Sequence, residues 1–146
     1  MTDPVTILSI INGSLGLALK IGTVIHALYD ISQKLKQAQL TILSTITECE
    51  TIQAAWSAIE RWASSHPDGT AIESELLERL NKSLLNGQMV ISAFEDDLIA
   101  WSRKSTNPGF LSRSRIVWEE NTFSQHQFRI RGQVAAMTLL LQVINL

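Results

Sequence analysis

Hydrophobic and polar positions in this chain recur at helical spacing almost from end to end. Residues 4–29, PVTILSIINGSLGLALKIGTVIHALY, form a nearly continuous apolar run with one narrow stripe of polar and small residues at steps of three and four. That stripe contains Thr6, Ser9, Gly13, Gly16, Lys20, Thr23, Ala27 and Asp30. Pro4 suits a first helical turn, and Asp3 is a preferred N-cap residue. We therefore predict a long hydrophobic N-terminal helix over residues 4–29.

Three further segments have the amphipathic pattern of long helices. The second segment runs from Leu35 to Ala63 and stops before the turn sequence SSHPDG. The third opens with Thr70 and Glu73 at the spacing of a capping box, and its apolar stripe continues to Trp101. After the breaker STNPG and a short apolar stretch, the last helix is predicted from about residue 122 to the end. Its expected buried side contains Phe123, Ile130, Val134, Met137, Leu141 and Ile144.

These patterns predict the fold class. No segment shows sustained period-two alternation between turn signals, so we expect no sheet. A length of 146 residues fits one domain with a substantial core. The prediction is an all-α, single domain over residues 1–146: an antiparallel bundle of four long helices, with a short extra helical segment before the last helix.

The chain has a high apolar content and a low charge for a soluble protein. Only 18% of residues are charged, against about a quarter in average domains. Acidic residues outnumber basic ones between residues 48 and 101, and the sign reverses after residue 101. The low charge indicates extensive burial, self-association or membrane contact. The asymmetry can hold a bundle together or present a basic end to an acidic surface.

The N-terminal helix has three interpretations. A helix that is apolar nearly all round is usual at the centre of a bundle. A permanent transmembrane helix is disfavoured because Lys20 ends the uncharged run short of the roughly 18–20 residues that a span needs. The aliphatic residues favour insertion by about 3–6 kcal/mol, whereas Lys20 costs about 2.5–3.5 kcal/mol, so insertion is marginal. Several copies that packed their Gly13 and Gly16 positions together would favour it. A secretory signal peptide is set aside because residues 1–3 carry no positive charge.

No catalytic or cofactor constellation is found. His26, His66 and His126 occur singly on separate segments, and we expect each at the surface or at its boundary. Cys49, the only cysteine, lies at a helix core position and is expected to be a small buried hydrophobe. The chain lacks a glycine-rich phosphate loop and is acidic overall, which disfavours nucleic acid as a partner. We predict no cofactor, no metal and no enzymatic activity.

Both ends of the chain resemble a known family. The opening MTDPVTILSIINGSLGLALKIGTVIHALYD resembles the start of the HeLo and HeLo-like domains of fungal NLR-type (STAND) receptors and of some short cluster-encoded fungal proteins. The closing WEENTFSQHQFRIRGQVAAMTLLLQVI, with the step Arg131-Gly132-Gln133, resembles the last helix of that family. The resemblance covers essentially the whole chain. Two departures are Lys20 within the apolar helix and an end at Leu146 without a sensor, nucleotide-binding or repeat domain.

The resemblance implies a helical-bundle effector of programmed cell death or signalling. Members are held inactive in the cytoplasm until a partner domain, such as an NLR-type receptor in cis or in trans, oligomerises them. The N-terminal helix then leaves the bundle and perturbs the plasma membrane. Here the chain is either a cut-out domain or a standalone protein that another chain activates.

The hypothesis for this chain is that the bundle stores the N-terminal helix and that self-association moves it toward anionic lipid. The residues assigned to the membrane-active helix are Asp3, Leu8, Ile11, Gly13, Leu15, Gly16, Leu19 and Lys20. The candidate headgroup contacts are Lys34, Lys36, Arg103, Lys104, Arg113 and Arg115, with Lys20 as a further candidate. The alternative is a soluble adaptor or oligomerisation module, in which the N-terminal helix stays in the core, Gly13 and Gly16 allow close packing, and the basic end docks an acidic partner.

Overall fold

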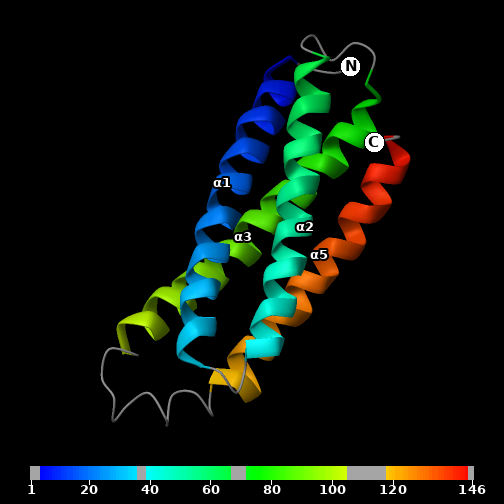
Figure 1. The fold of residues 1–146 in the computed structure, drawn as a ribbon. Coiled ribbons are helices and arrows are strands. Elements are labelled where there is room, and N and C mark those ends of the chain that lie inside the picture. Colours follow the sequence, from blue (N-terminus) through cyan, green and yellow to red (C-terminus); the bar gives the residue numbers. More distant parts are fainter. Residues whose placement is uncertain (1–3, 36–38, 67–71, 105–117, 145–146) are drawn as a thin grey trace.

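The computed structural model describes residues 4–35, 39–66, 72–104 and 118–144. Within these ranges the chain forms α1 (Pro4–Lys34), α2 (Gln39–Ser64), α3 (Ser74–Lys104), the π-helical segment η2 (Trp118–Phe123) and α5 (Ser124–Val143), and no strand (Figure 1). The predicted fold class is therefore confirmed: four long helices, with a short extra helical segment before the last.

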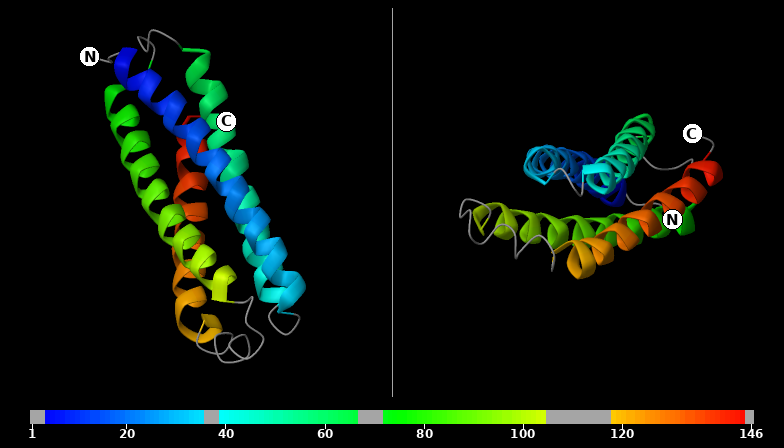
Figure 2. Two further views of the ribbon diagram at one scale, coloured as in Figure 1. Left: turned by 90° about the vertical axis from the view of Figure 1, so that its left-hand side faces the viewer. Right: turned by 60° about the horizontal axis from the view of Figure 1, so that its bottom comes forward.

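The helices form two layers. Consecutive long helices run in opposite directions (Figure 1). The first layer contains α1 and α2, and the second contains α3 and α5 (Figure 2). Helix α1 packs against α2 and α3, and α5 packs against the same two helices from the other side. As a result, α1 and α3 lie side by side and run in the same direction, although neighbours in sequence are antiparallel.

The core follows the apolar stripes of the sequence. Ile42, Ile46, Cys49, Ile52, Trp56, Ile59 and Ala63 are all buried along α2, and Leu80, Leu84, Ile91, Phe94, Leu98 and Trp101 are buried along α3. Where η2 leads into α5, the ring of Phe123 meets that of Phe94 of α3 edge to face, with the ring centroids 6.0 Å apart. Trp56 and Trp101 are core residues, as predicted. The stripes alone thus located most of the core.

Two predicted boundaries are wrong. Leu35 ends the first helical segment instead of beginning the second: its N–H donates to the Ile31 carbonyl at 2.9 Å, and α2 starts at Gln39. The third helix begins at Ser74, and the Glu73 carbonyl accepts from the Leu77 N–H at 3.2 Å. Glu73 therefore precedes α3 instead of lying in its first turn, so the predicted capping box does not open the helix. Its other member, Thr70, lies outside the described residues.

Candidate membrane-active helix and its surroundings

Helix α1 carries large apolar side chains on its exposed face as well as on its buried face, although Asn12, Thr23 and His26 are exposed too. The buried face contains Ile7, Ile10, Ile21, Val24 and Leu28, each at most 1% exposed. The outward face carries three leucines from the predicted membrane-active set: Leu8 is 55% exposed, Leu15 51% and Leu19 69%. The predicted polar stripe lies beside these leucines instead of forming the centre of the exposed face. Leucines in water gain nothing from the fold, so their presence here calls for an explanation.

The two glycines of the predicted seam differ in their surroundings. A Cβ atom on Gly13 would overlap the Leu84 side chain, so glycine at this position lets α1 approach α3 closely. A Cβ atom on Gly16 would meet nothing within 4 Å. Close packing within the bundle thus accounts for Gly13 and leaves Gly16 unexplained. Gly22, which the sequence did not single out, faces α2, where a Cβ would lie 3.1 Å from Gln53 Nε2.

Polar contacts attach α1 to both neighbouring helices. Lys20 Nζ donates to Ser92 Oγ of α3 at 2.7 Å and lies 3.7 Å from Glu95 Oε1. On the other side, Gln53 Nε2 of α2 donates to the Ala18 carbonyl at 3.0 Å. The charge that interrupts the apolar run is therefore paired inside the fold. No local sequence pattern predicts these contacts, because the partners lie on other helices, far along the chain.

The basic candidates gather partly at one end of the bundle. Lys34 is exposed in the last turn of α1, at the same end as the last turn of α3, which contains Arg103 and Lys104 (Figure 1). Asp3, Lys36, Arg113, Arg115 and the side chains of Arg103 and Lys104 lie outside the described residues. Ile11 is half-buried against the core.

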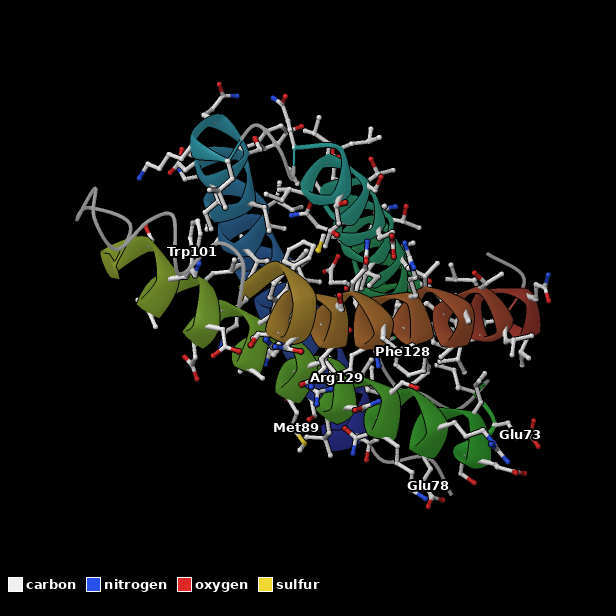
Figure 3. The ribbon with its side chains drawn as sticks, turned by 90° about the horizontal axis from the view of Figure 1, so that it is seen from below. Glu73, Glu78, Met89, Trp101, Phe128 and Arg129 are labelled. Atoms are coloured by element: carbon white, nitrogen blue, oxygen red, sulfur yellow. The ribbon has the colours of Figure 1, made fainter. Side chains whose placement is uncertain are left out.

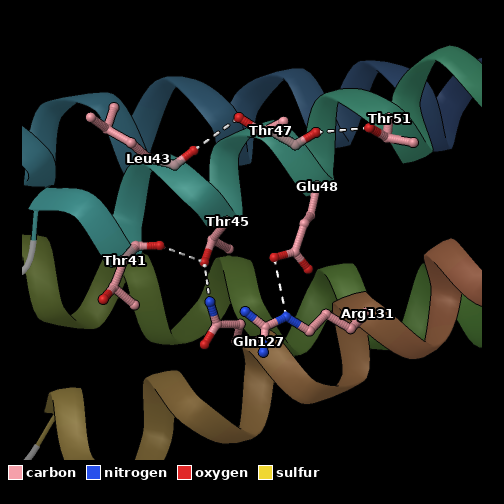
Figure 4. Close-up of polar contacts among 8 residues, drawn as sticks. All are labelled: Thr41, Leu43, Thr45, Thr47, Glu48, Thr51, Gln127 and Arg131. Carbon is pink, nitrogen blue, oxygen red and sulfur yellow. Dashed lines mark hydrogen bonds and ion pairs between the residues drawn. The ribbon is translucent and has the colours of Figure 1, made fainter.

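Other charges join helices internally. Arg131 Nε of α5 donates to Glu48 Oε1 of α2 at 3.2 Å, and Gln127 Nε2 donates to Thr45 Oγ1 at 3.3 Å (Figure 4). The Thr45 hydroxyl donates in turn to the Thr41 carbonyl at 3.0 Å. The acidic middle and the basic end of the sequence are thus used in part to hold α2 and α5 together.

His126 corrects one prediction. It is 3% exposed, not a surface or boundary residue. Its ring stacks on Phe94 with centroids 4.7 Å apart, and its Nε2 lies 2.6 Å from Asp97 Oδ2. The aromatic ring and the carboxylate of α3 together make burial of the imidazole acceptable. His26 is exposed and His66 is half-buried, as predicted.

The buried thiol of Cys49 is unreactive. Burial, together with smaller contributions from the nearby Glu48 and Glu50, raises the pKa of the thiol from 9.0 to about 12. The thiol therefore stays protonated at neutral pH and cannot act as a nucleophile there. Among the described residues, no three histidine, cysteine or acidic side chains come together as metal ligands.

Of the described helices, α1 alone has the length and composition of a membrane span. The most apolar 18 residues within Thr6–Lys34 have a mean hydropathy of 1.6, and 39% of that stretch is buried in the bundle. A soluble core helix or a signal sequence can pass the same test. Comparisons with protein-family models, curated proteins and solved structures gave no match. The assignment of α1 therefore depends on the contacts described above.

Proposed function

We propose that this chain is a membrane-targeting effector domain of cell-death or related signalling, which self-associates and exposes α1 to lipid. The observation that carries the proposal is the outward row of Leu8, Leu15 and Leu19 on a helix whose opposite face is also apolar. Such a helix can pack in two environments. In the bundle its inward face contacts α2 and α3, and in a bilayer both faces contact lipid.

The balance between bundle and bilayer supports conditional release. Withdrawal of α1 exposes its core face and costs the contacts of Lys20 with Ser92 and Glu95. In a bilayer, Lys20 near the middle of the helix costs about 2.5–3.5 kcal/mol, which offsets much of the gain from the leucines and isoleucines. A single copy therefore favours the bundle, because release of α1 would also expose the core residues of α2 and α3 that pack against it. Assembly of several copies, which shields Lys20 from lipid, is therefore the step expected to tip the balance.

The end of the bundle that carries Lys34 adds attraction to a cytoplasmic leaflet. Each lysine or arginine near an anionic surface contributes about 1 kcal/mol. Lys34 is exposed, and the chain positions of Arg103 and Lys104 lie at the same end. The protein is thus proposed to reside in the cytoplasm and to reach the plasma membrane on activation. An NLR-type receptor domain as activator, in cis or in trans, remains a prediction from the resemblance alone.

The test is dye release from liposomes, with and without anionic lipid, before and after forced oligomerisation. Removal of α1 is unsuitable because its buried face forms part of the core, so a truncated chain would lose more than the membrane segment. Leu15→Glu and Leu19→Glu avoid this problem because both side chains are exposed. The matched control is Leu85→Glu on α3, where the leucine is 53% exposed.

We expect the two α1 variants to unfold as the wild type does but to release at least tenfold less dye, because a glutamate in a span opposes insertion. Leu85→Glu should release dye at the wild-type rate. Equal release by all three variants would exclude α1 as the membrane-active element.

The soluble adaptor remains the second candidate, and the packing of Gly13 favours it. The overlap that any side chain at Gly13 would make with Leu84 means that α1 is fitted closely to α3. A module that keeps α1 in the core needs this fit, whereas a helix that leaves the bundle does not. No dye release from folded, forcibly oligomerised protein would favour the adaptor.

A further inference from the structure

The outward face of α5 carries large apolar side chains that no described element covers. Phe128 is 78% exposed, Leu139 64% and Val143 65%, and Gly132 and Ala135 between them are exposed as well. Figure 3 labels Phe128 and Arg129 on α5. An apolar row along a whole helix is typical of an interaction surface.

Six positions on this face have the same order from either end, whereas Val143 pairs with Ser124 and lies outside this symmetry. Going outward from the midpoint between residues 133 and 134, a small residue is followed by a large apolar residue and then by a glutamine in both directions. The pairs are Gly132 with Ala135, Phe128 with Leu139, and Gln125 with Gln142. At 3.6 residues per turn these six positions lie on one side of α5, and all six are exposed. A face with this symmetry is complementary to itself when it is turned end over end.

We propose that two copies of this chain associate through α5, antiparallel, about a two-fold axis that passes between residues 133 and 134. Phe128 then packs against the partner's Leu139, and Gly132 lies opposite the partner's Ala135. The small residues at the centre let the two helices approach, and the larger side chains close the contact at each end. Such an isologous contact gives a closed dimer with no tendency to form filaments.

The charges on α5 are compatible with this pairing. Its charged residues, Arg129 and Arg131, flank the apolar face on opposite sides. In the antiparallel register they lie level with the partner's Thr138 and the partner's Ala136, so no arginine meets an arginine. A parallel pairing would instead place each residue opposite its own copy, with arginine level with arginine. Charge therefore favours the antiparallel register.

The area of the face predicts the strength of association. Twenty residues make a helix about 30 Å long, and a face about 10 Å wide covers on the order of 300 Å² per copy. Stable interfaces bury about 800 Å² per partner. Because the face is much smaller than this, we expect a weak dimer that dissociates on dilution. This inference does not depend on the proposed function, because the outward leucines of α1 are not part of the α5 face.

Cysteine cross-linking tests the register directly. In a Cys49→Ala background, Gly132→Cys protein is mixed with Ala135→Cys protein and oxidised, and each is also oxidised alone. The two-fold pairing predicts rapid disulfide formation between the two different variants and at least tenfold slower formation between like variants. Dominant homotypic cross-linking of Ala135→Cys would indicate parallel pairing and would overturn the proposal, as would the absence of any cross-link.

Sedimentation of the otherwise wild-type chain, without lipid, provides the second measurement. We expect the average mass to rise with concentration toward that of a dimer, and Leu139→Glu to weaken association at least tenfold while the fold stays intact. Leu85→Glu on α3 is the control and should associate as the wild type does. A Leu139→Glu variant that associates normally, or that loses only vesicle binding, would assign the face to another partner and overturn the proposal. A failed dye-release experiment would leave this result unaffected.

Discussion

Helices α1 and α5 both carry apolar residues outward, but the bundle holds them differently. Helix α1 lies in close contact with α2 along its length and approaches α3 through Gly13, and Lys20 and Ala18 join it to both helices by polar contacts. Helix α5 packs over a smaller part of α2 and of α3. Its contacts to α2 include the Arg131–Glu48 ion pair, in which the arginine side chain is 60% exposed.

The difference shows that exposed leucines on two helices of one fold need not have the same cause. On α1 the outward leucines belong to a helix with the composition of a membrane span. On α5 the outward Phe128 and Leu139 lie on either side of the small residues Gly132 and Ala135, and arginines flank this face. The pattern on α1 suits lipid, because contact with lipid requires no complementary shape. The pattern on α5 suits a second copy of the same surface.

The largest expected effect comes from removing a buried side chain from each helix. Ile21→Ala in α1 and Ile130→Ala in α5 should each lower the free energy of unfolding by about 2–5 kcal/mol, because both isoleucines are fully buried and each substitution leaves a cavity. The control is Leu19→Ala, whose side chain is exposed and whose loss should cost less than about 0.5 kcal/mol. Urea unfolding measures all three. A small effect of Ile130→Ala would mean that α5 is not part of the cooperative core.

The sequence predicted the buried side of each helix better than the exposed side. Apolar spacing located Ile42, Phe94 and Ile130 in the core because helical periodicity fixes which positions share a face. It could not identify which apolar residues of α1 face solvent, since a helix that is apolar all round has no preferred side. That choice depends on how far α2 and α3 cover the helix, which is a property of the tertiary packing.

The apolar composition of α1 follows from the sequence, whereas its contacts with α2 and α3 do not. Lys20 was recognised as an interruption, yet its partners Ser92 and Glu95 are on α3 and have no signature in local sequence. His126 was placed at the surface because a lone histidine gives no indication of the carboxylate of Asp97 or the ring of Phe94. The symmetry of the α5 face was present in the sequence. It indicates an interaction surface only because Phe128 and Leu139 are exposed in the folded chain.

A stability effect of intermediate size is expected for substitution of Gly13 but not of Gly16, the two glycines of the predicted seam in α1. Gly13→Val forces a branched side chain against the buried Leu84 and should cost about 1–3 kcal/mol of unfolding free energy. Gly16→Val carries the same change in helix propensity but meets open space, so it should be close to neutral. Thermal unfolding of the pair measures the difference directly. Equal stabilities would show that α1 is not fitted closely to α3, and the contrast with α5 would disappear.

The smallest effect concerns Cys49 on α2, the helix that supports both α1 and α5. The pKa of its thiol is about 12 in the fold and near 9.0 when the chain is unfolded. Below pH 9 the thiol is protonated in both states, so it adds no pH dependence. As pH rises from 9 toward 12, only the unfolded chain loses the proton, and the folded state loses stability. At pH 10 this loss amounts to about 1.4 kcal/mol.

Urea unfolding of wild type and Cys49→Ala at pH 8 and pH 10 isolates this contribution, because all other titrating groups are common to both proteins. The wild type should lose about 1.4 kcal/mol more than Cys49→Ala over that interval. Equal losses would mean that solvent reaches the thiol in the folded chain. Helices α1 and α5 both pack against α2, so a solvent-accessible thiol would mean that water enters the interfaces of α2 with these helices. The exposed apolar residues of α1 and α5 would then not belong to a closed bundle.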